Sequence, residues 1–177
     1  MAERYDIKRV AEIKGRGIFV DANVLMYWNW ASAGSEQYAI DYSSVYMKLM
    51  KQQNKLFVDF LVISEVVNKI FKLSLNEYQK RDKNLQPKQF RDSEQGKATL
   101  SDIYSIIENQ LSDDFNIIGK AFSEDDIRGF LVADSLDFID KGILSICREN
   151  NFVLLTNDKD YKNSDIDILT CNKQILN

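Results

Sequence analysis

The chain is organised around the stretch Gly17-Ile18-Phe19-Val20-Asp21-Ala22-Asn23-Val24-Leu25. A short apolar run that ends on a carboxylate is typical of a buried parallel strand that delivers an acid to its carboxyl edge. Ligands bind at that edge in open α/β sheets. Because burying a carboxylate is costly unless a cation meets it, we expect a metal ion or a basic partner beside Asp21.

The composition indicates a folded protein of one domain. The chain has 177 residues, of which 45% are hydrophobic and 11% aromatic, enough to bury a sizeable core. One proline and 7 glycines leave no room for a low-complexity linker. No apolar run is long enough to span a bilayer, and the first residues lack the apolar core of a signal peptide. We therefore expect a cytoplasmic protein that does not enter a membrane.

The absence of histidine limits the chemistry. It excludes Ser-His-Asp and Cys-His catalysis and histidine-ligated zinc. An enzyme of this composition must work through carboxylates, a hard metal ion, lysine, tyrosine or backbone groups. The two cysteines, Cys147 and Cys171, have no metal or redox spacing, and we expect them to be small buried apolar residues.

Hydrophobic periodicity predicts strands that alternate with helices, and hence an α/β fold. Buried strands are expected at residues 18–20, 56–60 and 152–156, a short strand at 115–118 and an edge strand at 166–170. Helices are expected within residues 1–16, from a Ser35 cap to Met50, and at residues 61–71, 99–111 and 134–151. A further helix begins after Ser123.

Charge is distributed unevenly along the chain. Helical periodicity fades from Leu75 to Lys97, and residues 80–97 carry six basic and three acidic residues, a net charge of +3. We expect a solvated loop or a helix extension here. The alternative is a basic flap that holds a phosphate backbone, in which Lys88 and Arg91 contact RNA. Residues 102–140 are acidic, with a net charge of -8.

Four carboxylates are expected at one edge of the sheet. Asp21 and Asp158 follow predicted strands, while Glu65 and Asp140 lie in the early turns of helices beside such strand ends. Four carboxylates at one edge repel one another without a cation, so the set implies Mg²⁺ or Mn²⁺. A metal ion that orients water and polarises a phosphoryl group is the chemistry of phosphodiester cleavage.

Two of these acids, Glu65 and Asp158, also have a purely structural interpretation. Glu65 can complement the helix dipole, with Ser64 as the cap. The pair Asn157-Asp158 favours a turn. Asp137 precedes Asp140 by one helical turn, so both carboxylates can point the same way.

The acids lie in four motifs: Val20-Asp21-Ala22-Asn23-Val24-Leu25, Ile63-Ser64-Glu65-Val66-Val67-Asn68, Leu136-Asp137-Phe138-Ile139-Asp140 and Leu154-Leu155-Thr156-Asn157-Asp158-Lys159-Asp160-Tyr161. In this order they resemble the acidic motifs of PIN-domain nucleases, and especially those of the VapC-like toxins. The resemblance covers nearly the whole chain. It implies a three-layer α/β/α fold with a central, mostly parallel sheet, and a single domain over residues 1–177 with a polar, partly basic insertion at about residues 75–97.

The resemblance also implies an activity and a site. The activity is that of a Mg²⁺- or Mn²⁺-dependent endoribonuclease acting on RNA, the toxin of a toxin-antitoxin pair; such proteins are often homodimers and are often inhibited by a cognate antitoxin. By resemblance, the catalytic and metal-binding acids are Asp21, Glu65, Asp140 and Asp158. Asp160 is a further metal ligand, and the supporting residues are Asn23, Ser64, Asp137, Thr156 and Asn157.

Other functions stay open at this point. The chain can be an RNA-processing nuclease that is not a toxin, or a PIN-like module that binds RNA or protein without cutting. Asp59, at the end of an apolar strand, is compatible with a phospho-accepting receiver domain. That class requires an acidic pair on the first strand and a lysine at the end of a late strand, and neither is evident.

Overall fold

The computed structural model describes residues 2–30 and 33–177. Within these residues, six strands form one parallel sheet in the order β1-β6-β5-β2-β3-β4. The strands are β1 (Arg4–Asp6), β2 (Ile18–Val20), β3 (Leu56–Val58), β4 (Phe115–Ile117), β5 (Val153–Leu155) and β6 (Ile168–Thr170). The predicted parallel α/β sheet is confirmed, and it is parallel throughout.

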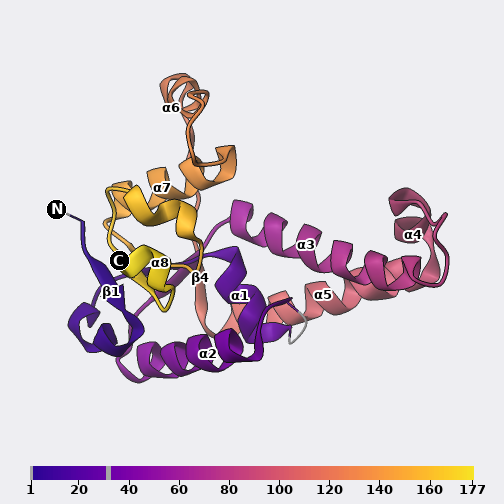
Figure 1. Cartoon of the computed structure of the whole chain (residues 1–177), viewed down its shortest axis with the longest axis horizontal. Helices are drawn as coiled ribbons and strands as arrows, with labels where there is room; N and C mark the ends of the chain where they lie inside the picture. The colour runs from indigo at the N-terminus through magenta and orange to yellow at the C-terminus, as the bar shows by residue number, and fades with distance from the viewer. Residues whose placement is uncertain (1, 31–32) are drawn as a thin grey trace.

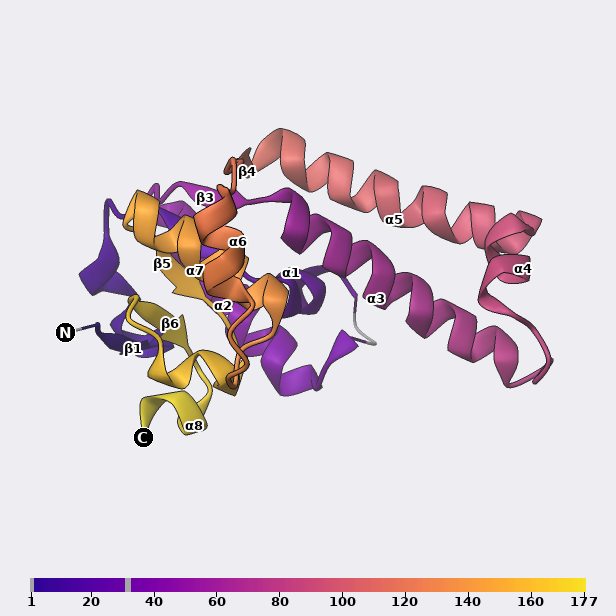
Figure 2. The same ribbon diagram turned by 90° about the horizontal axis from the view of Figure 1, so that it is seen from above.

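Helices cover both faces of the sheet, which gives the three layers. α2 (Glu36–Lys51) lies on one side of the sheet and α7 (Phe138–Asn150) on the other (Figures 1 and 2). The remaining helices are η1 (Ile7–Ile13), α1 (Ala22–Asn29), α3 (Phe60–Gln79), α4 (Pro87–Asp92), α5 (Glu94–Asp113), α6 (Glu124–Phe130), η3 (Lys159–Asn163) and α8 (Lys173–Leu176). No helix of the described part of the chain is long and apolar enough to cross a membrane.

The two central strands, β2 and β5, determine where a site can form. All three residues of each strand are buried, as expected for a parallel strand covered on both faces. From β2 the chain continues outward to β3 and β4, whereas from β5 it continues in the opposite direction to β6. The carboxyl ends of β2 and β5 therefore flank the topological switch point, where open parallel sheets bind ligands.

α3 and α5 project from the sheet as an antiparallel helical hairpin, with α4 at its far end (Figures 1 and 2). The segment 75–97 forms the end of α3, α4 and the start of α5. Phe90 of α4 is buried, with ring centroids 5.1 Å from Phe71 and 4.8 Å from Tyr78. The expected loop is found at residues 80–86 and the expected helix extension at the end of α3 and the start of α5. Residues 87–92 differ, because Phe90 packs them onto the hairpin as a separate helix, α4.

The structure differs from the sequence prediction at three elements: β1, β6 and α1. Residues 4–6 form β1 ahead of η1, where only a helix was expected. Because β1 pairs with β6, the strand at 168–170 is internal and not an edge strand. α1 was not predicted.

Helix starts are fixed by side chains that accept hydrogen bonds from backbone amides. Ser35 and Ser123 cap α2 and α6 as predicted. α3 is capped by Asp59 and not by Ser64, and α7 begins at Phe138 because Asp137 is its cap. The prediction of a helix from residue 134 is therefore four residues too long.

We expect Gly96→Ala to destabilise the hairpin. A Cβ at Gly96 would lie 1.9 Å from the carbonyl oxygen of Phe90, so α4 must move away from α5. The cost of such overpacking is about 1–3 kcal/mol. Urea denaturation measures it against Gly129→Ala in α6, where a Cβ meets nothing within 4 Å and helix propensity alone adds about 0.5–1 kcal/mol of stability. Equal effects of the two substitutions would contradict the close approach.

Candidate active site at the carboxyl edge of the sheet

Asp21 is the buried centre of the site. It follows β2 and is only 4% exposed. Its Oδ1 accepts a hydrogen bond from the Ala22 amide at 2.7 Å, and its Oδ2 accepts from Asn23 Nδ2 and Thr156 Oγ1, each at 2.5 Å. Burial, opposed by the Thr156 hydrogen bond and helped by the negative charges of Glu65 and Asp140, raises the pKa of Asp21 to about 7.

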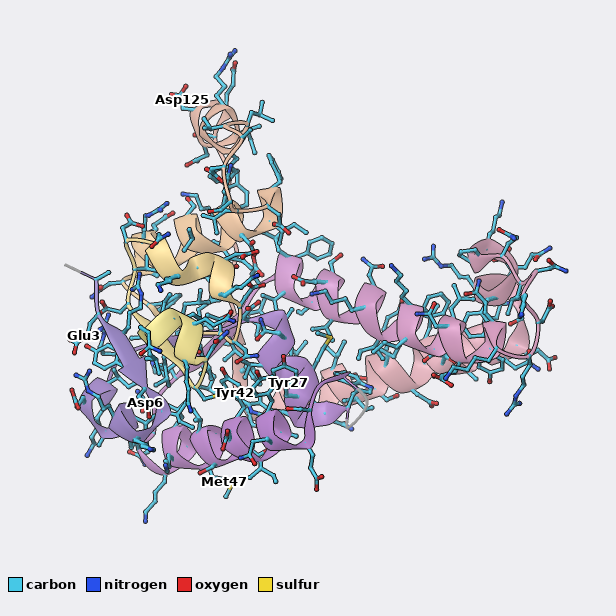
Figure 3. All side chains as sticks on the ribbon, in the orientation of Figure 1. Glu3, Asp6, Tyr27, Tyr42, Met47 and Asp125 are labelled. Carbon is cyan, nitrogen blue, oxygen red and sulfur yellow. The ribbon has the colours of Figure 1, made fainter. Side chains whose placement is uncertain are left out.

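The loop after β5 is held by a network centred on Asn157. Its amide nitrogen donates to Asn23 Oδ1 at 3.1 Å, and its Nδ2 donates to the Tyr27 hydroxyl at 3.3 Å. The Tyr42 hydroxyl lies 3.0 Å from both Asn157 Oδ1 and the Thr156 carbonyl oxygen. Tyr27 and Tyr42 lie side by side between α1 and α2 (Figure 3), with ring centroids 5.7 Å apart. These contacts fix the backbone that carries the next acid, Asp158.

Asp158 makes the predicted turn. Its Oδ1 accepts from the Asp160 amide at 3.0 Å and so caps η3, while its own amide donates to Thr156 Oγ1 at 2.9 Å. The Asp158 side chain is half-buried, and that of Asp160 is exposed. Thr156 therefore contacts both Asp21 and the backbone of Asp158.

Asp140 approaches from the third residue of α7. Its Oδ1 accepts a hydrogen bond from the fully buried Tyr161 hydroxyl at 2.6 Å. Burial raises the pKa of Asp140, the Tyr161 hydrogen bond lowers it, and the carboxylates of Asp137 and Asp158 raise it again; together these effects bring it to about 6. Asp137 lies outside the helix, and its Oδ1 accepts from the Asp140 amide at 2.8 Å. Asp137 thus caps the helix, and its carboxylate lies close enough to that of Asp140 to raise the pKa of Asp140.

Glu65 comes from the second turn of α3 and forms an ion pair with Lys69. Burial would lower the pKa of Lys69, but the carboxylates of Glu65, Asp21 and Asp158 outweigh it and hold the pKa above its ordinary value. The sequence reasoning missed Lys69, although a lysine four residues after a glutamate is a recognisable pair on a helix. It also missed Tyr161. Ser64 does not cap the helix; its Oγ accepts from Asn68 Nδ2 at 3.5 Å.

The four predicted acids are thus electrostatically coupled. Asp21 is coupled to Glu65 and Asp140, and Asp140 to Asp158. Their oxygens are the hard donors that Mg²⁺ and Mn²⁺ prefer, so the donor set fits such an ion. As they stand, no three acidic or cysteine side chains within residues 2–30 and 33–177 lie close enough to hold a metal ion. Glu65 is engaged by Lys69 through its Oε1.

Other candidates lie away from this cluster. Lys88 and Arg91 belong to α4, at the end of the hairpin remote from α1 and α7 (Figures 1 and 2). The Arg91 guanidinium lies 5.6 Å from the Phe71 ring centroid, which gives it a packing role. Asp59 caps α3 by accepting from the Val62 amide at 2.9 Å, so its burial is explained without a phospho-acceptor role. Cys147 is buried as expected, and Cys171 is partly buried.

The comparison with protein families identifies the class to which this fold belongs. The model of the PIN domain matches residues 18–166. The chain therefore belongs to the PIN-domain family, whose members are nucleases.

Two solved structures share the fold. VapBC2 from Rickettsia felis, described as bound to a DNA fragment from its promoter, is 16% identical with a TM-score of 0.50 over 87% of this chain and 98% of that chain. PAE2754 from Pyrobaculum aerophilum is 17% identical with a TM-score of 0.51 over 91% of this chain and 88% of that chain. No curated protein matches in sequence. At these identities the structural likeness establishes the fold alone.

We expect Asp21→Asn to stabilise the metal-free protein at high pH. The folded-state pKa of Asp21 lies above its unfolded value of about 3.9, so the folded protein retains a proton that the unfolded chain releases. The contribution of Asp21 to the free energy of unfolding is therefore fully present below about pH 4. It is lost as pH rises through about 7, and the loss reaches roughly 4 kcal/mol. In EDTA, the variant should unfold at higher urea than wild type at pH 8 and at similar urea at pH 4.5.

The control for this experiment is Asp102→Asn, which neutralises an exposed acid on α5. It removes one carboxylate charge from an exposed position under the same conditions. A gap between Asp21→Asn and wild type that stays constant from pH 4.5 to 8 would show that Asp21 is not a strained buried acid.

Proposed function

We propose that this protein is a Mg²⁺- or Mn²⁺-dependent endoribonuclease. The observation that carries the proposal is the match of the PIN-domain model to residues 18–166. It is supported by Asp21, Glu65, Asp140 and Asp158, which come from four separate segments and whose charges act on one another. Membership of a nuclease family supports the phosphodiester chemistry. RNA as the substrate rests on the resemblance of the motifs to the VapC-like branch.

The metal would be held by Asp21, Glu65, Asp140 and Asp158, with Asp160 as a further ligand. A bound divalent ion supplies Lewis acidity and an activated water for hydrolysis of a phosphodiester. A chain without histidine has no imidazole base, and this chemistry needs none. Asp160 is exposed and so is able to reach an ion from the solvent side.

The protein's own side chains position these acids. Asn23 and Thr156 fix the Asp21 carboxylate through hydrogen bonds to Oδ2, and Tyr161 fixes Asp140 through Oδ1. These donors stabilise the ionised carboxylates, which are the forms that bind a cation. Lys69 offsets the charge of Glu65 through their ion pair.

Metal-dependent cleavage tests the activity. Purified wild type should cut a mixed RNA with Mg²⁺ or Mn²⁺ and lose this activity in EDTA. Asp21→Asn should lose at least about 10²-fold in rate, because the buried central ligand is gone, while circular dichroism shows an intact fold. Asp102→Asn should cut like wild type. Cleavage that survives both EDTA and the Asp21 substitution would place the chemistry elsewhere.

The most specific form of the proposal is the toxin of a toxin-antitoxin pair with a protein antitoxin as partner. It is supported by the order of the four acidic motifs. One of the proteins with the same fold is described as a VapBC2 complex bound to a DNA fragment from its promoter. RNA processing without toxicity is the competing role.

Induced expression in a bacterial host separates these roles. Wild type should arrest growth within one or two generations, whereas Asp21→Asn, expressed to the same level, should not. Arrest requires the cleavage of an RNA that the cell needs, so it depends on the same carboxylate as hydrolysis in vitro. Normal growth with an enzyme that cuts RNA in vitro would favour the processing role.

A non-cleaving binding module is the second candidate. The observation that favours it is the Glu65–Lys69 ion pair, which offsets charge in the acid cluster without a metal. Calorimetric titration with Mn²⁺ decides between the two. The nuclease binds the ion in a manner that Asp21→Asn weakens, whereas a binding module shows no such site.

A further inference from the structure

A pocket of about 390 Å³ opens beside the acid cluster, between α1 and α3. Asn23 and Tyr27 line it from α1, and Lys69, Lys72 and Asn76 line it from α3. Two of these residues also belong to the site: Asn23 donates to Asp21, and Lys69 pairs with Glu65. The pocket is therefore continuous with the catalytic carboxylates.

The lining of this pocket is suited to an anion. Lys69, Lys72 and Asn76 follow one another at spacings of three and four residues, so they share one face of α3. No acidic side chain of the described residues lines the pocket, and Lys72 makes no ion pair within that part of the chain. A larger hollow of about 500 Å³ between α6 and α7 differs in this respect, since Asp125, Asp126 and Asp134 line it.

The α1 side of the pocket offers polar contacts that are already oriented. The Tyr27 hydroxyl accepts from Asn157 Nδ2, and Asn23 is held between Asp21 and the Asn157 amide. These groups are fixed by the same network that positions the loop after β5. The pocket thus has a rigid polar wall on α1 and a cationic wall on α3, and its volume lies within the range of pockets for small ligands, about 300–1,000 Å³.

We propose that this pocket is a substrate subsite that holds the phosphate and sugar of the nucleotide next to the cleaved bond in single-stranded RNA. Lys72 and Lys69 contact the phosphate, and Asn23, Tyr27 and Asn76 contact the sugar and the edge of the base. Lys69 serves both places: it pairs with Glu65 in the free protein and turns to the phosphate when the substrate and a metal ion arrive. This inference rests on the proposed ribonuclease function.

Binding of RNA without cleavage tests the subsite. The probe is a fluorescein-labelled, mixed-sequence single-stranded RNA of twelve nucleotides, titrated with the full-length protein in EDTA. Lys72→Gln should raise Kd about five- to tenfold at low salt, and it should reduce the slope of log K against log salt by about 0.7, as expected when one phosphate contact to a single strand is lost.

The matched control is Lys55→Gln, which removes the same charge from an exposed residue at the amino end of β3, on the opposite edge of the sheet. Its Kd and salt slope should equal those of wild type. Lys72 is exposed and makes no side-chain hydrogen bond to the described residues, so the thermal unfolding of Lys72→Gln should match wild type and any loss of binding reports on the pocket.

A double variant at the end of the hairpin, Lys88→Gln with Arg91→Gln, tests the competing path for RNA. If this variant weakens binding while Lys72→Gln binds like wild type, RNA follows α4 and the subsite is overturned. Failure of wild type to bind the RNA at all overturns it as well. Weaker binding by Lys72→Gln alone, or by both variants, supports the subsite.

A separate measurement, RNA cleavage by wild type with Mg²⁺ or Mn²⁺, tests the proposed nuclease function. If wild type never cuts but Lys72→Gln still binds RNA more weakly, the pocket stands and the nuclease proposal falls. If wild type cuts, Lys72→Gln should raise KM about five- to tenfold with little change in kcat, because it removes binding that the ground state and the transition state share. A loss confined to kcat would contradict the subsite.

Discussion

The hydrogen bond between the Thr156 hydroxyl and the Asp21 carboxylate joins the two strands on which the site depends. β2 and β5 pair in parallel with Val20 opposite Leu155. The next residues, Asp21 after β2 and Thr156 after β5, therefore lie side by side. The ladder extends one step further, because the Asp21 amide donates to the Leu155 carbonyl oxygen at 3.0 Å. Backbone pairing alone therefore brings the acid and its hydroxyl partner together, and their hydrogen bond fixes the orientation of the carboxylate.

The cost of this arrangement is electrostatic. A carboxylate that is only 4% exposed and lies near two other acids is destabilised in its charged form, which the raised pKa of Asp21 reports. The chain compensates only in part, with the donors of Asn23 and Thr156 and with the charge of Lys69. Local arrangements that lower stability are expected where function requires them. Here the unmet demand is for positive charge, which is what a divalent cation supplies.

The sequence predicts this part of the fold because the signal is local. Ile18–Val20 and Val153–Leu155 are short apolar runs that end next to acids, so strand, burial and sheet edge can all be inferred from neighbouring residues. β1 gives no such signal. It is three residues long, only Tyr5 is buried, and it exists because it pairs with a strand about 160 residues later in the chain.

The hairpin was misjudged for a related reason. The parts of α3 and α5 near the sheet show helical periodicity, but from Leu75 to Lys97, at the far end of the hairpin, most residues are polar and the periodicity fades. Phe90, a single aromatic residue in a polar segment, carries the packing at the far end, between Phe71 and Tyr78. One residue is too little for a periodic pattern. The basic residues around it fit a flap on the sequence alone, and only the structure shows that their backbone is helical.

The position at which α3 begins determines which of its side chains face the candidate site. Asp59 follows β3 and caps the helix by accepting a hydrogen bond from the Val62 amide, which fixes where the first turn begins. From that start, Glu65 reaches the acid cluster, and Lys69 and Lys72 follow on the face that lines the pocket. In the proposed function and subsite, this one helix supplies both an acid for the metal and two cations for the phosphate. An acid that sequence reasoning weighed as a phosphate acceptor is therefore the residue that sets this alignment.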